Sequence, residues 1–234
     1  EKLLAWNIPC PRFEFLFEQY TNSEEYNGMY EKFNSSIKEW EEHSGKTLEK
    51  LVDIMYLYDT LYVEHRKSFE LPYWAINALE SNSTMEYLAA FHLQAFTSST
   101  ELRKLEVGFV IKEMLDRFNS KSLAALQPNR SLWVYSAHDL SIVNILNGLG
   151  LYELHIPPYA SSLHFELYEN GTNFYIQIFY RKDNEEILSP LRVPNCGVKC
   201  SLHEFYKLYD EILPDQFEDY SAACQHEVKS RAQN

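Results

Sequence analysis

Residues 132–148, Leu-Trp-Val-Tyr-Ser-Ala-His-Asp-Leu-Ser-Ile-Val-Asn-Ile-Leu-Asn-Gly, contain the pattern that decides the fold class. The first four residues are apolar and β-prone, and the residues after Asp139 have the apolar spacing of an amphipathic helix that ends near Gly148. The pattern predicts a strand, a loop and a helix. His138 and Asp139 are therefore expected beyond the end of a strand and at the start of a helix, where α/β proteins concentrate ligand-binding and catalytic groups.

The His138-Asp139 pair has two interpretations on local grounds. An imidazole and a carboxyl group at this position could bind an anion and donate a proton. Alternatively, Asp139 caps the helix and His138 is a polar loop residue. The dipeptide alone does not decide between the two.

The residues before this motif indicate a succession of helices. Positions 11–120 carry no convincing strand signal. Apolar residues recur at helical spacing over 47–66, 84–99 and 100–118. We therefore expect residues 1–125 to be mainly helical.

The residues after the motif indicate a small sheet. Aromatic and β-branched residues fill two segments on either side of Glu-Asn-Gly-Thr at 169–172, which is a good hairpin signal. The expected elements are strands over 161–168, 173–181 and 187–193 and a helix over 201–213. The fold class is thus α/β, with an α/β part over 126–224 that packs with the helical part into a single domain, 1–234, and a loose tail over 225–234.

The composition excludes several classes of function. The chain has 234 residues, and 34 acidic against 21 basic side chains give a net charge of −13. This charge repels nucleic acid and anionic membrane surfaces and favours cationic ligands. Only 7 glycines are present, and they form no phosphate-binding nucleotide loop. No apolar run approaches the length of a membrane span.

The cysteines and glycosylation motifs predict a secreted, extracellular protein. Cys10, Cys196, Cys200 and Cys224 are even in number, which favours structural disulfides over a zinc site, although three pairings are open. The Asn-x-Ser/Thr motifs that could carry glycans begin at Asn34, Asn82, Asn129 and Asn170. The histidines show no metal-ligand spacing, so no metal and no cofactor are expected.

Several segments, in this order along the chain, resemble the histidine acid phosphatases. Tyr-Ser-Ala-His-Asp at 135–139 is similar to the active-site signature near the family's C-terminus. The other segments that look like family landmarks are Pro9-Cys10-Pro11-Arg12-Phe13, Tyr58-Asp59-Thr60-Leu61-Tyr62, Leu71-Pro72-Tyr73-Trp74-Ala75, Pro157-Pro158-Tyr159-Ala160-Ser161 and Pro194-Asn195-Cys196 followed by Cys200. The resemblance covers nearly the whole chain. It implies a histidine-phosphatase-like (phosphoglycerate-mutase-like) sheet flanked by helices, with a helical cap region.

The resemblance also implies roles for single residues. In the family the His-Asp pair binds phosphate and protonates the leaving alcohol. The resemblance pairs Cys10 with Cys224 and Cys196 with Cys200. It further places Trp74 and Tyr62 in segments that line the substrate cleft, although Tyr62 also lies on the apolar stripe of the 47–66 helix, where core packing explains it equally well.

One departure from the family changes the expected function. The family begins with Arg-His-Gly-x-Arg-x-Pro, whose histidine is the nucleophile and whose arginines clamp the phosphoryl group, and no Arg-His-Gly occurs in this sequence. Loss of a nucleophile alone can lower turnover by about 10⁶-fold. We therefore expect no catalytic residues, a vestigial His138-Asp139 pair and no phosphatase activity. The alternative is that the chain is the C-terminal portion of an active, phosphohistidine-forming acid phosphatase whose N-terminal segment is absent.

The missing arginine clamp indicates a cationic ligand. Without it, the Asp139 carboxylate is free to pair with an ammonium group. The chain also resembles the truncated, inactive acid-phosphatase-like proteins in the saliva of blood-feeding insects such as fleas, which implies sequestration of host mediators: biogenic amines such as serotonin, and lipid mediators such as leukotrienes. Asp139, His138, Trp74 and Tyr62 are the expected binding residues. A third possibility is a protein that acts only through its acidic surface, with weak, salt-sensitive binding.

Overall fold

The computed structural model describes residues 9–80, 83–182, 188–215 and 219–225. The contacts between residues group the chain into two compact units. One comprises Phe17–Phe96 with Glu153–Ile156, and the other comprises Glu1–Leu16, Thr97–Tyr152 and Pro157–Asn234. We call them the helical unit and the mixed unit and describe each by itself. The single domain over 1–234 stays a prediction, and the predicted loose tail lies almost wholly outside the described residues.

The helical unit is built from amphipathic helices around a common core. Serines that precede two of the helices accept hydrogen bonds from first-turn backbone groups, since Ser23 Oγ accepts from Tyr26 N at 3.2 Å and Ser83 Oγ from Glu86 N at 3.1 Å. The core side chains come from most of the helices. The elements that lie wholly in this unit are α2 (Glu24–Lys32), α3 (Asn34–Ser44), α4 (Leu51–Arg66), α5 (Tyr73–Ala78) and α6 (Thr84–Gln94). The helices predicted over 47–66 and 84–99 correspond to α4 and α6.

The mixed unit contains the sheet. The strands β1 (Ser162–Asn170) and β2 (Asn173–Arg181) form an antiparallel hairpin, with Phe165 opposite Ile178, and the turn between them places Gly171 at a φ of +64°. Such a backbone angle favours glycine. Two short strands, β3 (Ser189–Pro190) and β4 (Cys200–Ser201), pair with β2. The predicted hairpin is thus present.

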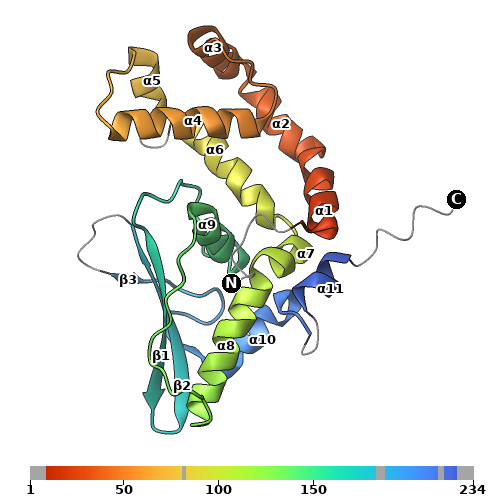
Figure 1. Ribbon diagram of the computed structural model, residues 1–234, viewed down its shortest axis with the longest axis vertical. Coiled ribbons are helices and arrows are strands. Elements are labelled where there is room, and N and C mark those ends of the chain that lie inside the picture. Colours follow the sequence, from red (N-terminus) through yellow and green to blue (C-terminus); the bar gives the residue numbers. More distant parts are fainter. Residues whose placement is uncertain (1–8, 81–82, 183–187, 216–218, 226–234) are drawn as a thin grey trace, which may run out of the picture. The chain divides into compact units, whose positions relative to one another are not determined.

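Helices cover one face of this sheet (Figure 1). Ile176 and Ile178 of β2 are fully buried against Ile111 and Leu115 of α8 (Phe109–Ser122) and Phe205 of α10 (Leu202–Tyr209). The other helical elements of this unit are α7 (Thr100–Arg103), the π-helical turn η3 (Lys104–Gly108), α9 (Asp139–Gly148), the 3-10 turn η4 (Asp210–Ile212) and α11 (Tyr220–Gln225). α1 (Pro11–Thr21) and the 3-10 turn η2 (Ala95–Thr97) contain residues of both units. The predicted α/β class is confirmed.

Two strand predictions need correction. Residues 132–135 form no strand, because they have no neighbouring strand with which to pair, and they run as a coil between α8 and α9 (Figure 1). The strand predicted over 187–193 is reduced to β3 at its centre. Beyond β3, the Leu191 N–H still donates to the Ile178 carbonyl oxygen at 2.7 Å. Val193 forms an isolated bridge with Gly197 instead of continuing the ladder.

Two disulfides join the four cysteines in the pairs that the resemblance implies. Cys10 is bonded to Cys224 across 214 positions, and both side chains are buried. Cys196 is bonded to Cys200 across 4 positions. The long-range bond closes most of the chain into one loop, so it restricts the unfolded chain far more than the short one does.

None of the helices in the described part of the chain is both long enough and apolar enough to cross a bilayer.

Gly108 provides a test of the packing between η3 and η4. A Cβ atom at position 108 would lie 2.0 Å from the Ile212 carbonyl oxygen, whereas one at Gly28, inside α2, would have no atom within 4 Å. We expect Gly108→Ala to lower the free energy of unfolding by about 1–3 kcal/mol, because backbone must move. Gly28→Ala should raise it by up to about 1 kcal/mol through helix propensity. Urea denaturation of both variants checks this, and wild-type stability of Gly108→Ala would contradict the close approach.

Candidate functional site

His138 and Asp139 lie together at the N-terminus of α9, where both side chains are exposed. His138 precedes the helix, and its backbone N–H donates to Ser141 Oγ at 3.4 Å. Asp139 is the first helical residue, and its Oδ1 accepts from the Leu140 N–H at 2.7 Å. A helix N-terminus carries partial positive charge, which stabilises the carboxylate. The structure therefore presents both an imidazole and a carboxylate to solvent at the start of α9.

Helix α8 holds the coil that leads to this pair. The Arg117 guanidinium lies 5.3 Å from the ring centre of Trp133 and 5.7 Å from that of Tyr135. The same side chain donates to the Tyr135 hydroxyl and pairs with Glu113 at 2.5 Å, and the Tyr135 hydroxyl donates to Glu113 at 2.9 Å. Burial, assisted by Glu113, raises the pKa of Tyr135 to about 12. This network of cation–π contacts and hydrogen bonds replaces the ladder of the predicted strand.

The alternation of a strand persists in this coil. Leu132 is 74% and Val134 is 82% exposed, whereas Trp133 and Tyr135 face Arg117. Alternate residues thus point to opposite sides, as in a strand, but the inward ones contact a helix. This explains why the sequence pattern of a strand occurs where no strand forms.

Polar side chains anchor α9 to the rest of the mixed unit. Asn144 is 3% exposed, and its Nδ2 donates to Glu106 Oε2 of η3 at 2.8 Å. Asn147 Nδ2 donates to Thr97 Oγ1 at 2.8 Å. The helix that carries His138 and Asp139 is therefore held by hydrogen bonds as well as by apolar contacts, and these bonds fix its rotation about its own axis.

Glu106 has an unusual environment. Burial raises its pKa from 4.5 to about 7. The Oδ1 atom of Asn144 has no hydrogen-bond partner among the described residues, and the proton of a neutral glutamic acid is of the kind that an amide oxygen accepts. Sequence reasoning did not single out Glu106. The signal that could have found it is a pair of polar residues, Glu106 and Asn144, inside two apolar helical runs.

Trp74 and Tyr62, the other expected binding residues, lie in the helical unit. The indole of Trp74 stacks on the His43 ring, with ring centres 5.6 Å apart and an angle of 9° between the planes. Tyr62 stacks on Tyr58 at 5.9 Å. Both are partly buried and pack against the core of that unit. Each therefore has a structural role, which agrees with the core-packing interpretation of Tyr62, and both belong to a different unit from His138 and Asp139.

The glycosylation motifs lie mainly on the surface. Asn34, Asn129 and Asn170 are exposed, and Asn129 Oδ1 is close enough to accept from Lys121 Nζ. Asn82 lies outside the described residues. Glycans at these positions stay a prediction.

Possible metal ligands converge at one place in the described part of the chain: Cys196, Cys200 and Glu204. The two cysteines are joined in a disulfide, which offers no thiolate to a metal in this state.

Stability should depend on pH through Glu106. Its folded-state pKa lies above the unfolded value, so its contribution to stability is fully present below pH 4.5 and is lost as the pH rises to about 7. We expect Glu106→Gln to flatten this fall and to make the protein more stable than wild type above pH 7, by on the order of 2 kcal/mol. Thermal unfolding from pH 4 to 8 measures the effect. The exposed Glu169→Gln serves as the control, and parallel profiles for wild type and Glu106→Gln would contradict the assignment.

The chain matches a known family over most of its length. The model of the histidine phosphatase superfamily, branch 2, matches residues 2–181. Prostatic acid phosphatase of Rattus norvegicus is 31% identical over 217 residues, which are 92% of this chain and 56% of that protein. Lysosomal acid phosphatases of Rattus norvegicus and Bos taurus are each 29% identical, over 96% of this chain and 53% of their own length.

The chain spans about half the length of these curated relatives. The activities and substrates of those whole proteins are therefore not assigned to this chain. The match of the family model over 2–181 nevertheless covers far more than half of the sequence. The chain belongs to the histidine phosphatase superfamily, branch 2.

Proposed function

We propose that this chain is a catalytically inactive acid-phosphatase-like protein that binds and sequesters small cationic aromatic mediators, foremost biogenic amines such as serotonin. The observation that carries the proposal is that the His138-Asp139 pair is exposed at the N-terminus of α9 in a sequence that contains no Arg-His-Gly. The groups that would bind and protonate a leaving group are present. The expected nucleophile and its arginine clamp are not among the 234 residues.

The charge of the pair supports an ammonium ligand. A carboxylate without a phosphate-binding arginine clamp attracts a cation, and a charge-assisted hydrogen bond contributes about 1.5–3 kcal/mol. A cation–π contact adds about 0.5–2 kcal/mol. Micromolar binding needs about 8 kcal/mol, so burial of the aromatic ring of the ligand must supply the rest. Aromatic side chains make up 15% of this chain and include 17 tyrosines.

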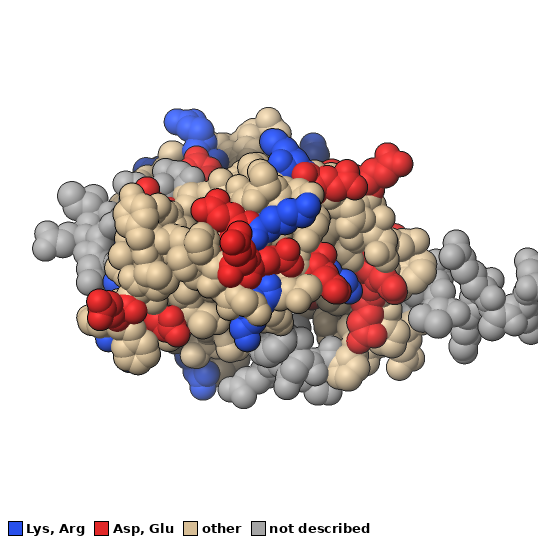
Figure 2. All heavy atoms as spheres, turned by 90° about the horizontal axis from the view of Figure 1, so that it is seen from above, with Lys and Arg blue, Asp and Glu red and all other residues tan. Residues whose placement is uncertain are grey.

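The charge of the helical unit supports the same class of ligand. Residues 17–96 carry 14 acidic and 6 basic side chains. Figure 2 shows acidic side chains gathered in groups on the face seen there. Such a surface raises the local concentration of cations. Trp74 and Tyr62 are partly buried in this unit, and each ring stacks on another ring. In the proposal, an aromatic ligand packs against these two side chains.

Secretion is part of the proposal. Two disulfides and exposed glycosylation motifs at Asn34, Asn129 and Asn170 are features of proteins that mature in an oxidising compartment. A secreted protein would meet amines that act between cells. A salivary source is an extension of the same proposal and rests on the resemblance alone.

Lipid mediators such as leukotrienes are the second proposed ligand class. Phe69, Tyr73 and Ile76, around the start of α5, are 64%, 79% and 44% exposed and would suit an apolar chain. The carboxylate of such a lipid is, however, repelled by a net charge of −13. We therefore place amines first.

Calorimetric titration with serotonin tests the amine proposal. Asp139→Asn keeps the shape of the side chain and removes its charge, so we expect about tenfold weaker binding or more. Trp74→Ala should weaken binding by up to about tenfold. Glu169→Gln, which removes an exposed charge elsewhere, is the control. The neutral analogue 5-hydroxytryptophol should bind wild type more weakly than serotonin does, and it should bind Asp139→Asn as well as serotonin does. If the affinity for serotonin is the same in Asp139→Asn as in wild type, the site lies elsewhere.

The absence of catalysis has its own test. The purified chain should hydrolyse an aryl phosphate no faster than Asp139→Ala does, because the expected nucleophile is missing. Hydrolysis that Asp139→Ala abolishes would overturn the proposed inactivity. Sequencing the transcript upstream of residue 1 decides the alternative, since an encoded Arg-His-Gly would make this chain a portion of an active acid phosphatase, as its coverage of about half of each relative allows.

A further inference from the structure

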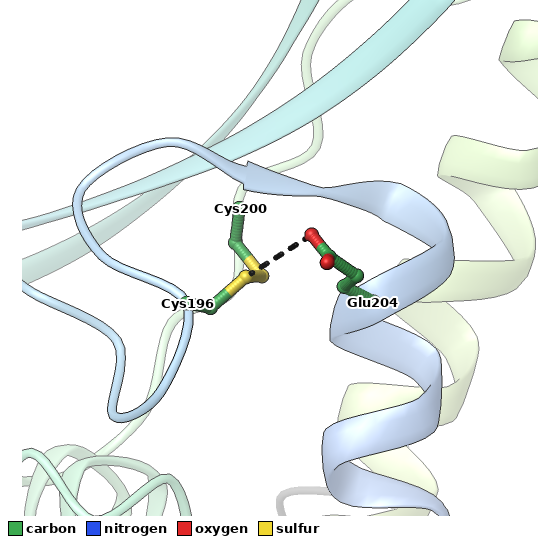
Figure 3. Close-up of side chains that lie close together, drawn as sticks. All are labelled: Cys196, Cys200 and Glu204. Carbon is green, nitrogen blue, oxygen red and sulfur yellow. Dashed lines mark hydrogen bonds between the residues drawn. A yellow bond between two sulfur atoms is a disulfide. The ribbon is translucent and has the colours of Figure 1, made fainter.

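The loop before α10 brings three possible metal ligands together. Cys196 lies in the turn that the Val193–Gly197 bridge closes, Cys200 begins β4, and Glu204 lies in the first turn of α10. Their ligand atoms all lie within 4.8 Å of one another. Figure 3 shows the Glu204 carboxylate pointing from the helix towards the two sulfur atoms, with Oε2 3.8 Å from Cys196 Sγ.

The carboxylate is held in this orientation by the cap of α10. Ser201 Oγ accepts from the Glu204 N–H at 3.2 Å and donates to Glu204 Oε2 at 3.0 Å. These two hydrogen bonds fix both the backbone and the side chain of Glu204. Ser201 therefore orients the oxygen in the absence of a metal.

We propose that reduction of the Cys196–Cys200 disulfide turns Cys196, Cys200 and Glu204 into a binding site for a thiophilic divalent cation of the Zn²⁺ type. Two thiolates and a carboxylate are ligands that Zn²⁺ takes, and two cysteines separated by three residues fall within the spacing of zinc sites. The fourth position of the metal is left to water or to an outside ligand. This site is separate from His138-Asp139 and does not rest on the proposed function.

The chemistry balances with an external thiol or phosphine as the reductant. The reductant supplies two electrons and is itself oxidised, the S–S bond breaks, and each sulfur takes up one proton. The metal then displaces these two protons into solvent and forms two metal–sulfur bonds.

This disulfide is the one that a mild reductant should open first. Cys196 is partly exposed, whereas Cys10 and Cys224 of the other bond are 3% and 4% exposed. The Cys196–Cys200 bond also closes a loop of only 4 positions, so its loss releases little unfolded-state entropy compared with the loss of the bond across 214 positions.

The fold should keep the backbones of Cys196 and Cys200 close together after reduction, while the two sulfur atoms move from bonding distance to the wider separation that two ligands of one metal require. Cys200 is fully buried in the core of the mixed unit, and it is paired with Ile176 of β2. The bridge between Val193 and Gly197 holds the backbone next to Cys196 independently of the disulfide. A metal would thus meet a site whose backbone is held in place and whose two sulfur atoms separate by side-chain rotation.

Titration of the full chain with Co²⁺ tests the proposal. After mild reduction by a phosphine, mass spectrometry of the alkylated protein should count two free thiols, and Co²⁺ should then bind at one per chain with a sulfur-to-cobalt charge-transfer band that Zn²⁺ removes. The unreduced protein should show no band. Absence of the band in the reduced protein would overturn the proposal.

Variants separate the proposed site from adventitious binding. Glu204→Gln should weaken Co²⁺ binding by at least about tenfold while it keeps the charge-transfer band, since the sulfurs remain. Cys196→Ser combined with Cys200→Ser should abolish the band, and Glu211→Gln, an exposed glutamate that follows α10, should leave both affinity and band unchanged. Circular dichroism checks that each variant is folded. A band that survives the double serine variant, or an affinity that Glu204→Gln leaves unchanged, would refute the assignment.

Discussion

Burial of one face of β2 is the interaction on which the mixed unit depends. Ile176 and Ile178 are completely excluded from solvent, and full burial of such a side chain contributes about 1.5–3 kcal/mol. β2 is also the strand with which β1, β3 and β4 all pair. Removing its apolar face would therefore release the helices that cover it and the short strands that depend on it. The placement of α8 follows from this contact, and the position of Arg117 follows from α8.

Arg117 links that core to the candidate site. By holding Trp133 and Tyr135, it fixes a coil that has no strand partner and thereby the entry into α9. The inner face of α9 is fixed by the hydrogen bonds of Asn144 and Asn147. The exposed His138-Asp139 pair thus stands on an element that is constrained from both sides, which suits a site that must present a carboxylate in a constant direction.

Acidic groups influence both ligand binding and stability in this protein. A net charge of −13 favours cations as ligands in general, while the exposed Asp139 carboxylate supplies a particular position for one. Glu106 acts in the opposite way, because its burial makes the charged form unfavourable and ties stability to an acidic environment. The acidic surface and the buried acid therefore have separate consequences, one for binding and one for folding.

Local sequence signals determined much of this protein. Helical spacing predicts α4, α6 and α9, and the turn around Gly171 predicts the β1–β2 hairpin, because these elements are stabilised by residues close to one another in the chain. The family motifs single out His138 and Asp139 for the same reason, since the two are neighbours in sequence. The composition determines the net charge of the molecule, which disfavours nucleic acid and anionic membrane surfaces as partners.

The remaining features depend on contacts between segments that are distant in sequence. Residues 132–135 have the pattern of a strand, but a strand needs a second strand with which to pair. The rings of Trp133 and Tyr135 contact Arg117 instead. The raised pKa of Glu106 arises from burial by segments distant in sequence, and the convergence of Glu204 with the Cys196–Cys200 disulfide depends on how β4 passes into α10. Spacing along a chain fixes local geometry, whereas desolvation and convergence depend on which distant segments pack together.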